Sequence, residues 1–174
     1  TLHYIMEACA ENNITLMLLD RPNPNGAIVD GPMLEKEYTS FVGMHPVPIV
    51  HGMTVGEFAQ MINGEGWLPE KKTCKLKIVK VLNYKHDMEY VLPVNPSPNL
   101  NTPQSILLYP STCLFEGTRL NHGRGTYFAF TILGSPLYKG VYDFSYTPTS
   151  IKGMSESPLY MDELCYGIDL RKYD

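Results

Sequence analysis

The feature that most constrains the fold is an unbroken apolar run at residues 14–19, which follows a helical pattern at residues 2–11. One face of that helix is apolar and carries Leu2, Ile5, Met6 and Cys9. A strand that is apolar at every position is typical of a sheet covered on both faces, as the parallel sheets of α/β proteins are. The start of the chain therefore predicts an α/β fold with a parallel, doubly wound sheet.

Two later helices are predicted from their first residues. Thr54 and Glu57 have the spacing of a capping box, and the helix that they begin is expected to end near residues 64–66. Thr102 is followed by proline, which is typical of an N-cap and a first helical residue. This second helix is expected to be short, because Pro110 should interrupt it.

Further strands are predicted at residues 75–82, 128–133 and 165–170, and residues 89–92 are expected to be extended. Prolines and glycines punctuate the chain after about residue 135, which predicts a domain boundary there. We therefore expect one domain at residues 1–134 and the beginning of another at residues 135–174.

The composition excludes several classes of function. The net charge is −4 and the basic residues are scattered, so nucleic acid is not an expected partner. No apolar run approaches the roughly 20 residues of a transmembrane helix, and no transmembrane segment is predicted. The four cysteines lie far apart in sequence, which predicts buried thiols or disulfides; we expect no metal and no cofactor. The motifs of serine hydrolases, P-loop enzymes and zinc proteases are absent from the sequence.

The sequence DRPNPNG (residues 20–26) follows the first apolar strand, at the edge of the sheet where doubly wound folds bind ligands. Its two prolines restrict the loop, so Asp20, Arg21 and Asn23 are candidates for contacts with a hydroxyl-rich ligand. In the alternative interpretation Asp20 pairs with Arg21 and the asparagines satisfy turns. The residues leave both interpretations open.

Three further polar residues are candidates for binding. His51 lies just before the N-terminus of the second helix, where backbone N–H groups favour an anionic ligand group; alternatively, it caps the helix or packs in the core. In PSPN (residues 96–99) a stiff backbone presents Ser97 and Asn99, either for contacts with sugar hydroxyls or as a structural corner.

The stretch CLFEGTRLNHGRGT (residues 113–126) is the richest in reactive side chains, including Glu116, Thr118 and Arg124. A carboxyl group beside apolar residues is more easily kept protonated, as a general acid must be. Glu116 is therefore the candidate proton donor. The alternative is a salt bridge between Glu116 and Arg124 that ties the loop without any catalysis.

Five motifs, taken in order, resemble those of the exo-β-N-acetylmuramidase family, which is glycoside hydrolase family 171 and was formerly domain of unknown function 1343. They are LLDRPNP, HGMTVGEFA, LPVNPSPNL, LLYPSTCLFEGT and GRGT. The resemblance implies a secreted or periplasmic bacterial protein with a Rossmann-like catalytic domain and a smaller C-terminal α+β domain. It also implies a glycosidase that releases terminal N-acetylmuramic acid from peptidoglycan fragments, in cell-wall turnover and recycling.

On this resemblance the chain looks like an internal fragment of a family member. Residues 1–134 would be the C-terminal part of the Rossmann-like domain, and residues 135–174 the beginning of the smaller domain. Asn121 and His122 stand where the family often has a small residue and a variable one. A protein of the same fold that binds peptidoglycan or other carbohydrate without cleaving it is the alternative function.

The site that the resemblance implies uses Glu116 as the acid. Glycosidases generally need a second carboxyl group, for which the candidates are Asp20 and a residue upstream of Thr1, so retention and inversion are both open. Arg124 and His51 are expected near the lactyl carboxylate of muramic acid. The remaining predicted substrate-binding residues are Arg21, Asn23, Ser97, Asn99 and Thr118.

Overall fold

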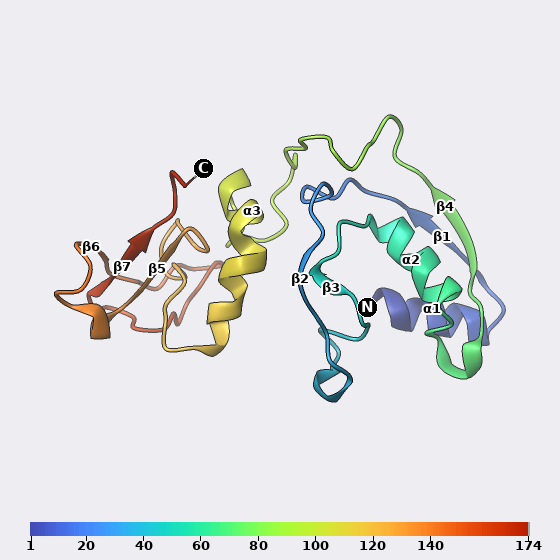
Figure 1. Cartoon of the computed structure of the whole chain (residues 1–174), viewed down its shortest axis with the longest axis horizontal. Helices are drawn as coiled ribbons and strands as arrows, with labels where there is room; N and C mark the ends of the chain where they lie inside the picture. The colour runs from blue at the N-terminus through green and yellow to red at the C-terminus, as the bar shows by residue number, and fades with distance from the viewer. Residues whose placement is uncertain (174) are drawn as a thin grey trace. The chain divides into compact units, whose positions relative to one another are not determined.

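In the computed structural model, which describes residues 1–173, helix α1 (Leu2–Glu11) leads through a turn into strand β1 (Thr15–Leu19), as the sequence predicts (Figure 1). Strand β1 pairs in parallel with β4 (Lys75–Val79), with Thr15 opposite Lys75 and Leu19 opposite Val79. The α/β class with parallel strands is therefore confirmed. Strand β4 ends at Val79 rather than at residue 82, and residues 89–92 form no strand.

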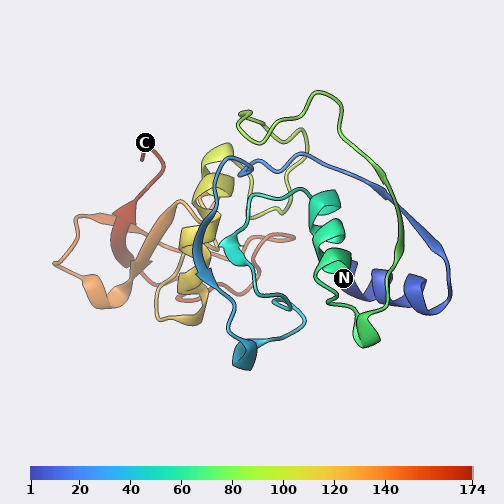
Figure 2. The ribbon, with the colours of Figure 1, turned by 45° about the vertical axis from the view of Figure 1, so that its right-hand side comes forward.

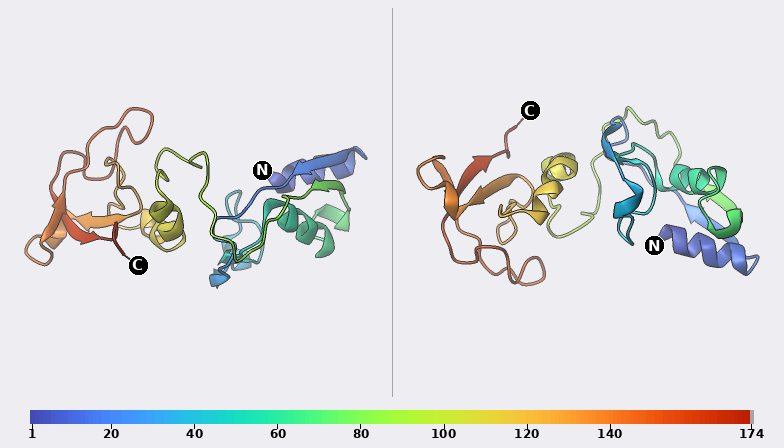
Figure 3. Two further views of the ribbon diagram at one scale, coloured as in Figure 1. Left: turned by 90° about the horizontal axis from the view of Figure 1, so that it is seen from above. Right: turned by 60° about the horizontal axis from the view of Figure 1, so that its bottom comes forward.

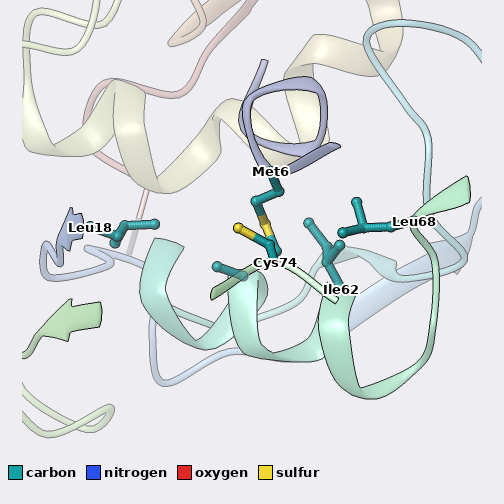
Figure 4. Close-up of a cluster of buried hydrophobic side chains, with 6 residues drawn as sticks. Met6, Leu18, Ile62, Leu68 and Cys74 are labelled. Carbon is teal, nitrogen blue, oxygen red and sulfur yellow. The ribbon is translucent and has the colours of Figure 1, made fainter. Parts of the chain in front are cut away.

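Helices α1 and α2 (Val55–Gly64) lie beside the β1–β4 pair (Figures 1 and 3). Between helices and sheet is a core of buried side chains made by Met6, Leu18, Ala59, Ile62, Leu68 and Cys74 (Figure 4). The expectation of a strand covered on both faces is met on one face only within the described residues. Met17 and Leu19 alternate with the buried Leu18 and are 56% and 67% exposed.

The capping box at the start of α2 forms as predicted, because the Thr54 hydroxyl accepts from the backbone N–H of Glu57 and the Glu57 carboxylate accepts from that of Thr54. Between β1 and α2 the chain forms an antiparallel pair, β2 (Asp30–Met33) with β3 (Pro48–Val50), joined through the short helix η1 (Lys36–Tyr38). The sequence patterns did not predict this pair. A further short helix, η2 (Pro69–Lys71), precedes β4.

Helix α3 (Pro103–Thr112) begins at Pro103 as predicted, but the expectation that Pro110 interrupts it is wrong. Pro110 lies near the end of α3, where it removes one backbone N–H donor and the last turn still forms. Thr112, the last residue of the helix, also bonds through its hydroxyl to the Leu108 carbonyl at 2.9 Å and to the Phe130 carbonyl at 3.2 Å. The chain continues directly into the 3₁₀ helix η3 (Cys113–Gly117).

A three-stranded antiparallel sheet follows, in the order β5 (Ile132–Ser135), β7 (Cys165–Asp169) and β6 (Phe144–Tyr146). Helix α3, in yellow, lies beside these orange and red strands (Figure 2), and η4 (Pro136–Tyr138) follows β5 directly. The strand expected at 165–170 is confirmed. The strand expected at 128–133 begins only at Ile132, because residues 128–131 form a turn in which Phe130 has a φ of 65°.

The chain divides into two units, Thr1–Tyr90 and Val91–Asp174. The domains expected at residues 1–134 and 135–174 stay a prediction. In the second unit, strand β5 pairs with β7 from Ile132 to Ser135. Among the described residues, no helix has the length and apolar character needed to cross a membrane.

We predict that Thr54→Ala lowers the free energy of unfolding by about 1–2 kcal/mol, because an N-cap hydroxyl is lost together with its bond to Asp20. Urea unfolding followed by circular dichroism measures the change. Thr54→Ser keeps the hydroxyl and should stay close to the parent protein; equal losses in both variants would refute the capping role.

Candidate functional site

Asp20 joins the end of β1 to the start of α2. Its Oδ1 accepts hydrogen bonds from the backbone N–H groups of Gly56 and Arg21 at 2.8 and 2.9 Å, and its Oδ2 accepts from the Thr54 hydroxyl at 2.8 Å. A Cβ on residue 56 would lie 2.8 Å from the carboxyl carbon of Asp20, so this approach requires glycine. The carboxylate is thus held at a helix N-terminus, where a negative charge is stabilised.

Both polar groups of the Asn23 side chain make hydrogen bonds with the backbone. Its Nδ2 donates to the Met53 carbonyl at 3.0 Å, and its Oδ1 accepts from the backbone N–H of Asn25 at 2.9 Å. The Tyr84 hydroxyl donates to the backbone carbonyl of Asn23 at 3.2 Å and accepts from its N–H at 3.3 Å. The structure thus agrees with the interpretation in which Asn23 satisfies the hydrogen bonds of a turn. Tyr84 supports this loop, which could not be predicted because residues 23 and 84 are far apart in sequence.

His51 and Arg21 line a cavity of about 750 Å³ together with Asn23. The His51 Nδ1 accepts from the backbone N–H of Met53 at 3.1 Å, which places the ring hydrogen on Nε2. The ring stacks on Phe58 with centroids 5.3 Å apart, and burial lowers the pKa of His51. His51 therefore packs beside the helix start, as one interpretation predicted, and also borders the cavity as a neutral imidazole.

His86 is a further residue of this region whose contacts the sequence did not reveal. Its Nε2 lies 3.0 Å from Oε1 of Glu57 and its Nδ1 lies 3.2 Å from the Gly26 carbonyl, so it links the DRPNPNG loop to α2. The bond to Glu57 raises the pKa of His86. Burial alone would raise the pKa of Glu57, but the Thr54 N–H and His86 outweigh it and the pKa is lowered.

In the second unit, Glu116, His122 and Arg124 form one polar cluster. Arg124 donates from Nη2 to Oε1 of Glu116 at 3.3 Å and from Nε to Nε2 of His122 at 2.9 Å. The salt bridge that the sequence offered as one interpretation is therefore present. The Glu116 and Arg124 side chains are 40% and 35% exposed, so both remain accessible to a ligand.

Asn121 holds the backbone around this cluster. Its Nδ2 donates to the carbonyls of Arg124 and Leu159 at 3.1 and 2.8 Å, and its Oδ1 accepts from the Gly123 N–H and the Tyr146 hydroxyl. Burial raises the pKa of Tyr146, so its phenol stays protonated. The wide spacing between residues 121 and 146 explains why sequence reasoning did not pair them.

The other predicted residues of this unit make structural contacts. The Thr118 hydroxyl donates to the Phe115 carbonyl at 2.8 Å and accepts from the Leu120 N–H at 3.1 Å, which closes η3. The Ser97 hydroxyl accepts from the backbone N–H of Asn99 at 3.2 Å. Asn99 is only 5% exposed and donates to the Met154 carbonyl at 2.9 Å, so the PSPN loop forms a structural corner.

The predicted residues thus fall into two sets. Asp20, Arg21, Asn23 and His51 gather around the start of α2, whereas Glu116 and Arg124 gather around His122. Within residues 1–173 no three side chains of His, Cys, Asp or Glu are grouped so as to hold a metal ion. All four cysteines are free thiols, of which Cys74 and Cys165 are buried.

Comparison with known proteins places both units in one family. Residues 1–104 match the family described as exo-β-N-acetylmuramidase NamZ, N-terminal, and residues 107–174 match the corresponding C-terminal family. The chain therefore belongs to the exo-β-N-acetylmuramidase family, as its five motifs predicted. The two matches meet near the start of α3.

The relatives agree with this assignment. The chain is 40% identical to the peptidoglycan β-N-acetylmuramidase NamZ of Bacillus subtilis strain 168, over 98% of this chain and 44% of the relative. A crystal structure of a DUF1343 family protein from Bacteroides fragilis is 47% identical, with a TM-score of 0.96 over 99% of this chain and 48% of that one. A second protein of that family and organism is 29% identical, with a TM-score of 0.80 over 97% and 47%. The chain thus spans about half the length of the relatives that it matches.

A buried histidine in the first unit makes stability depend on pH. His45 is 8% exposed, its ring stacks on Trp67 at 4.5 Å, and its Nε2 has no hydrogen-bond partner. Burial and the neighbouring His3 lower the pKa of His45 from the ordinary value of 6.5. The unfolded chain therefore binds a proton at His45 before the folded chain does, and stability is lost as the pH falls below about 6.5.

We predict that His45→Phe reduces this acid sensitivity, because phenylalanine keeps the stacking surface and does not titrate. Thermal unfolding of both proteins between about pH 7.5 and about pH 5 tests it. The parent protein should lose more stability across this range than the variant. Parallel losses would show that His45 is not a source of the dependence.

Proposed function

We propose that the whole protein is a glycoside hydrolase that releases terminal N-acetylmuramic acid from peptidoglycan fragments. The observation that carries the proposal is the match of both units to the exo-β-N-acetylmuramidase family. The name of the Bacillus subtilis relative, a peptidoglycan β-N-acetylmuramidase, supports it. We further propose that β1 and β4 belong to a Rossmann-like sheet, and that the protein is secreted or periplasmic, as the family resemblance implies.

We assign the acid role to Glu116 and the recognition of the muramic acid carboxylate to Arg124. In the free protein Arg124 donates a hydrogen bond to Glu116. A substrate carboxylate that binds Arg124 would compete for this donor and release Glu116 from the salt bridge. The released carboxyl group would then be available to the leaving-group oxygen, as a general acid must be.

The proposed contacts with sugar hydroxyls and the carboxylate are made by Asp20, Arg21, Asn23, His51, Ser97, Asn99 and Thr118. Asp20 is also the proposed second carboxyl group. Its oxygens accept three hydrogen bonds, which hold the carboxylate in one orientation, as the second carboxyl group of a glycosidase requires. His51 offers a free Nε2–H at the cavity that Arg21 also borders.

We predict that Glu116→Gln lowers kcat of the full-length protein on a chromogenic N-acetylmuramide by roughly 10²–10⁴-fold, as loss of a general acid does. Glu11→Gln, at the exposed end of α1, is the matched control and should keep the parent activity. Undiminished turnover by Glu116→Gln would remove Glu116 from the acid role.

Asp20→Asn tests the second carboxyl group. If Asp20 takes part in the reaction, we expect kcat to fall by roughly 10²-fold or more while circular dichroism shows an intact fold. Thr54→Ala removes one bond to the Asp20 carboxylate and keeps the charge, so it should alter kcat much less. A large fall in both variants would indicate a structural effect instead.

A second candidate function is favoured by the same contacts. Because Asp20 is bound to α2 and Glu116 to Arg124, both candidate carboxylates have structural partners. A protein that binds peptidoglycan sugars without cleaving them would keep these contacts permanently. Calorimetric binding of N-acetylmuramic acid with no product release from a chromogenic substrate would favour that function over hydrolysis.

A further inference from the structure

The contact between His122 and Arg124 determines which ring nitrogen of His122 carries hydrogen. Arg124 Nε lies 2.9 Å from His122 Nε2. A guanidinium group only donates hydrogen bonds, so Nε2 must be the acceptor and the ring hydrogen is on Nδ1. His122 is therefore a neutral imidazole in one defined tautomer. The neutral form is required by the contact itself.

The surroundings of His122 leave it little freedom. It is 8% exposed, and its ring stacks on the buried ring of Phe130 with centroids 4.9 Å apart. The backbone carbonyl of His122 accepts from the N–H of Phe130 at 2.7 Å. The Arg124 guanidinium carbon lies 5.3 Å from the centroid of the same Phe130 ring. His122 and Phe130 thus form a rigid support for the guanidinium group.

This support fixes the direction of the remaining Arg124 donors. The Nε–H is used by His122 and Nη2 donates to Glu116 at 3.3 Å, while the Arg124 side chain stays 35% exposed. A guanidinium that recognises a carboxylate works best when its planar donors are held in one orientation. Without an acceptor at position 122, Arg124 would keep its charge and lose this orientation.

We propose that His122 is a positioning residue that, as the neutral Nδ1–H tautomer, orients Arg124 towards the carboxylate of the muramic acid substrate. The proposal rests on the proposed function, in which Arg124 binds that carboxylate. It adds a residue that does not touch the substrate, and it makes substrate affinity depend on the protonation of a buried ring.

The pH dependence follows from the groups that face His122. Burial lowers its pKa and the charge of Arg124 lowers it further, whereas Glu116, 3.9 Å from Nε2, and the Leu120 carbonyl act in the opposite direction; the pKa is lowered overall. The neutral ring thus persists at neutral pH. When the pH falls far enough to protonate His122, Nε2 can no longer accept and two cations face each other. Arg124 is then released and substrate affinity decreases.

Two variants of the full-length protein separate these effects. His122→Gln retains an uncharged acceptor near the place of Nε2, and His122→Phe retains a ring that can stack on Phe130 but offers no acceptor. The measurements are KM and kcat on a chromogenic N-acetylmuramide, and calorimetric Kd for free N-acetylmuramic acid, each from about pH 8 to about pH 5. Nitrogen-15 NMR of the parent protein identifies the His122 tautomer.

For His122→Phe we expect KM and Kd to rise about tenfold or more, with a smaller change in kcat. His122→Gln should stay within about threefold of the parent at neutral pH and lose the parent's rise of KM and Kd on the acid side. An unchanged Kd in a folded His122→Phe protein would overturn the proposal, as would an Nε2–H tautomer in the NMR spectrum. If His122→Phe does not fold, the pH profile of His122→Gln and the tautomer of His122 in the parent protein still test the proposal.

The binding and NMR measurements do not require turnover. If the parent protein binds N-acetylmuramic acid and fails to hydrolyse the chromogenic substrate, the proposed hydrolase function fails while the role of His122 can still be measured. If hydrolysis is normal and neither variant alters affinity or its pH dependence, the role of His122 fails and the hydrolase function stands.

Discussion

The arrangement of the first unit depends on the bond between the Asp20 carboxylate and the N-terminus of α2. Strand β1 ends at Leu19, and the next residue accepts from Gly56 and Thr54. One side chain thereby fixes the distance between the sheet and the helix that covers it. The same bond fixes the start of the DRPNPNG loop, so the positions of Arg21 and the loop asparagines depend on it. The bond between Asp20 and α2 therefore both stabilises the fold and positions the candidate site.

Asn121 has the corresponding role in the second unit through an uncharged side chain. It is 1% exposed, and its amide joins three stretches of chain through Gly123, Leu159 and Tyr146. A buried amide with all its hydrogen bonds made is far less costly than one left unpaired. Gly123 and Gly125 both have a φ of 83°, which lets the loop turn tightly around this amide. The orientation of the neighbouring Arg124 depends on that turn.

The sequence predicted the features that local patterns determine. The apolar run after α1, the capping box at Thr54 and the proline start of α3 all appear as expected, since each depends on residues close in sequence. The β2–β3 pair and the turn before β5 did not follow from any local pattern, because distant contacts decide them. For the site, the motifs identified loops in which polar side chains gather around Asp20 and around Glu116, and the roles of these residues stay predictions. The motifs could not show that the side chains of Asn23 and Thr118 would make hydrogen bonds with nearby backbone groups.

The carboxylates of Asp20 and Glu116 differ in how firmly the surrounding structure holds them. Asp20 is bound by three donors, of which the Gly56 backbone N–H and the Thr54 hydroxyl belong to the start of α2. Glu116 is bound by one long side chain, and that pair is more than a third exposed. Exchange of a partner at an exposed ion pair costs little, because such pairs contribute only about 0–1 kcal/mol. We therefore expect a competing ligand carboxylate to displace Arg124 from Glu116 more readily than it displaces the donors that hold Asp20.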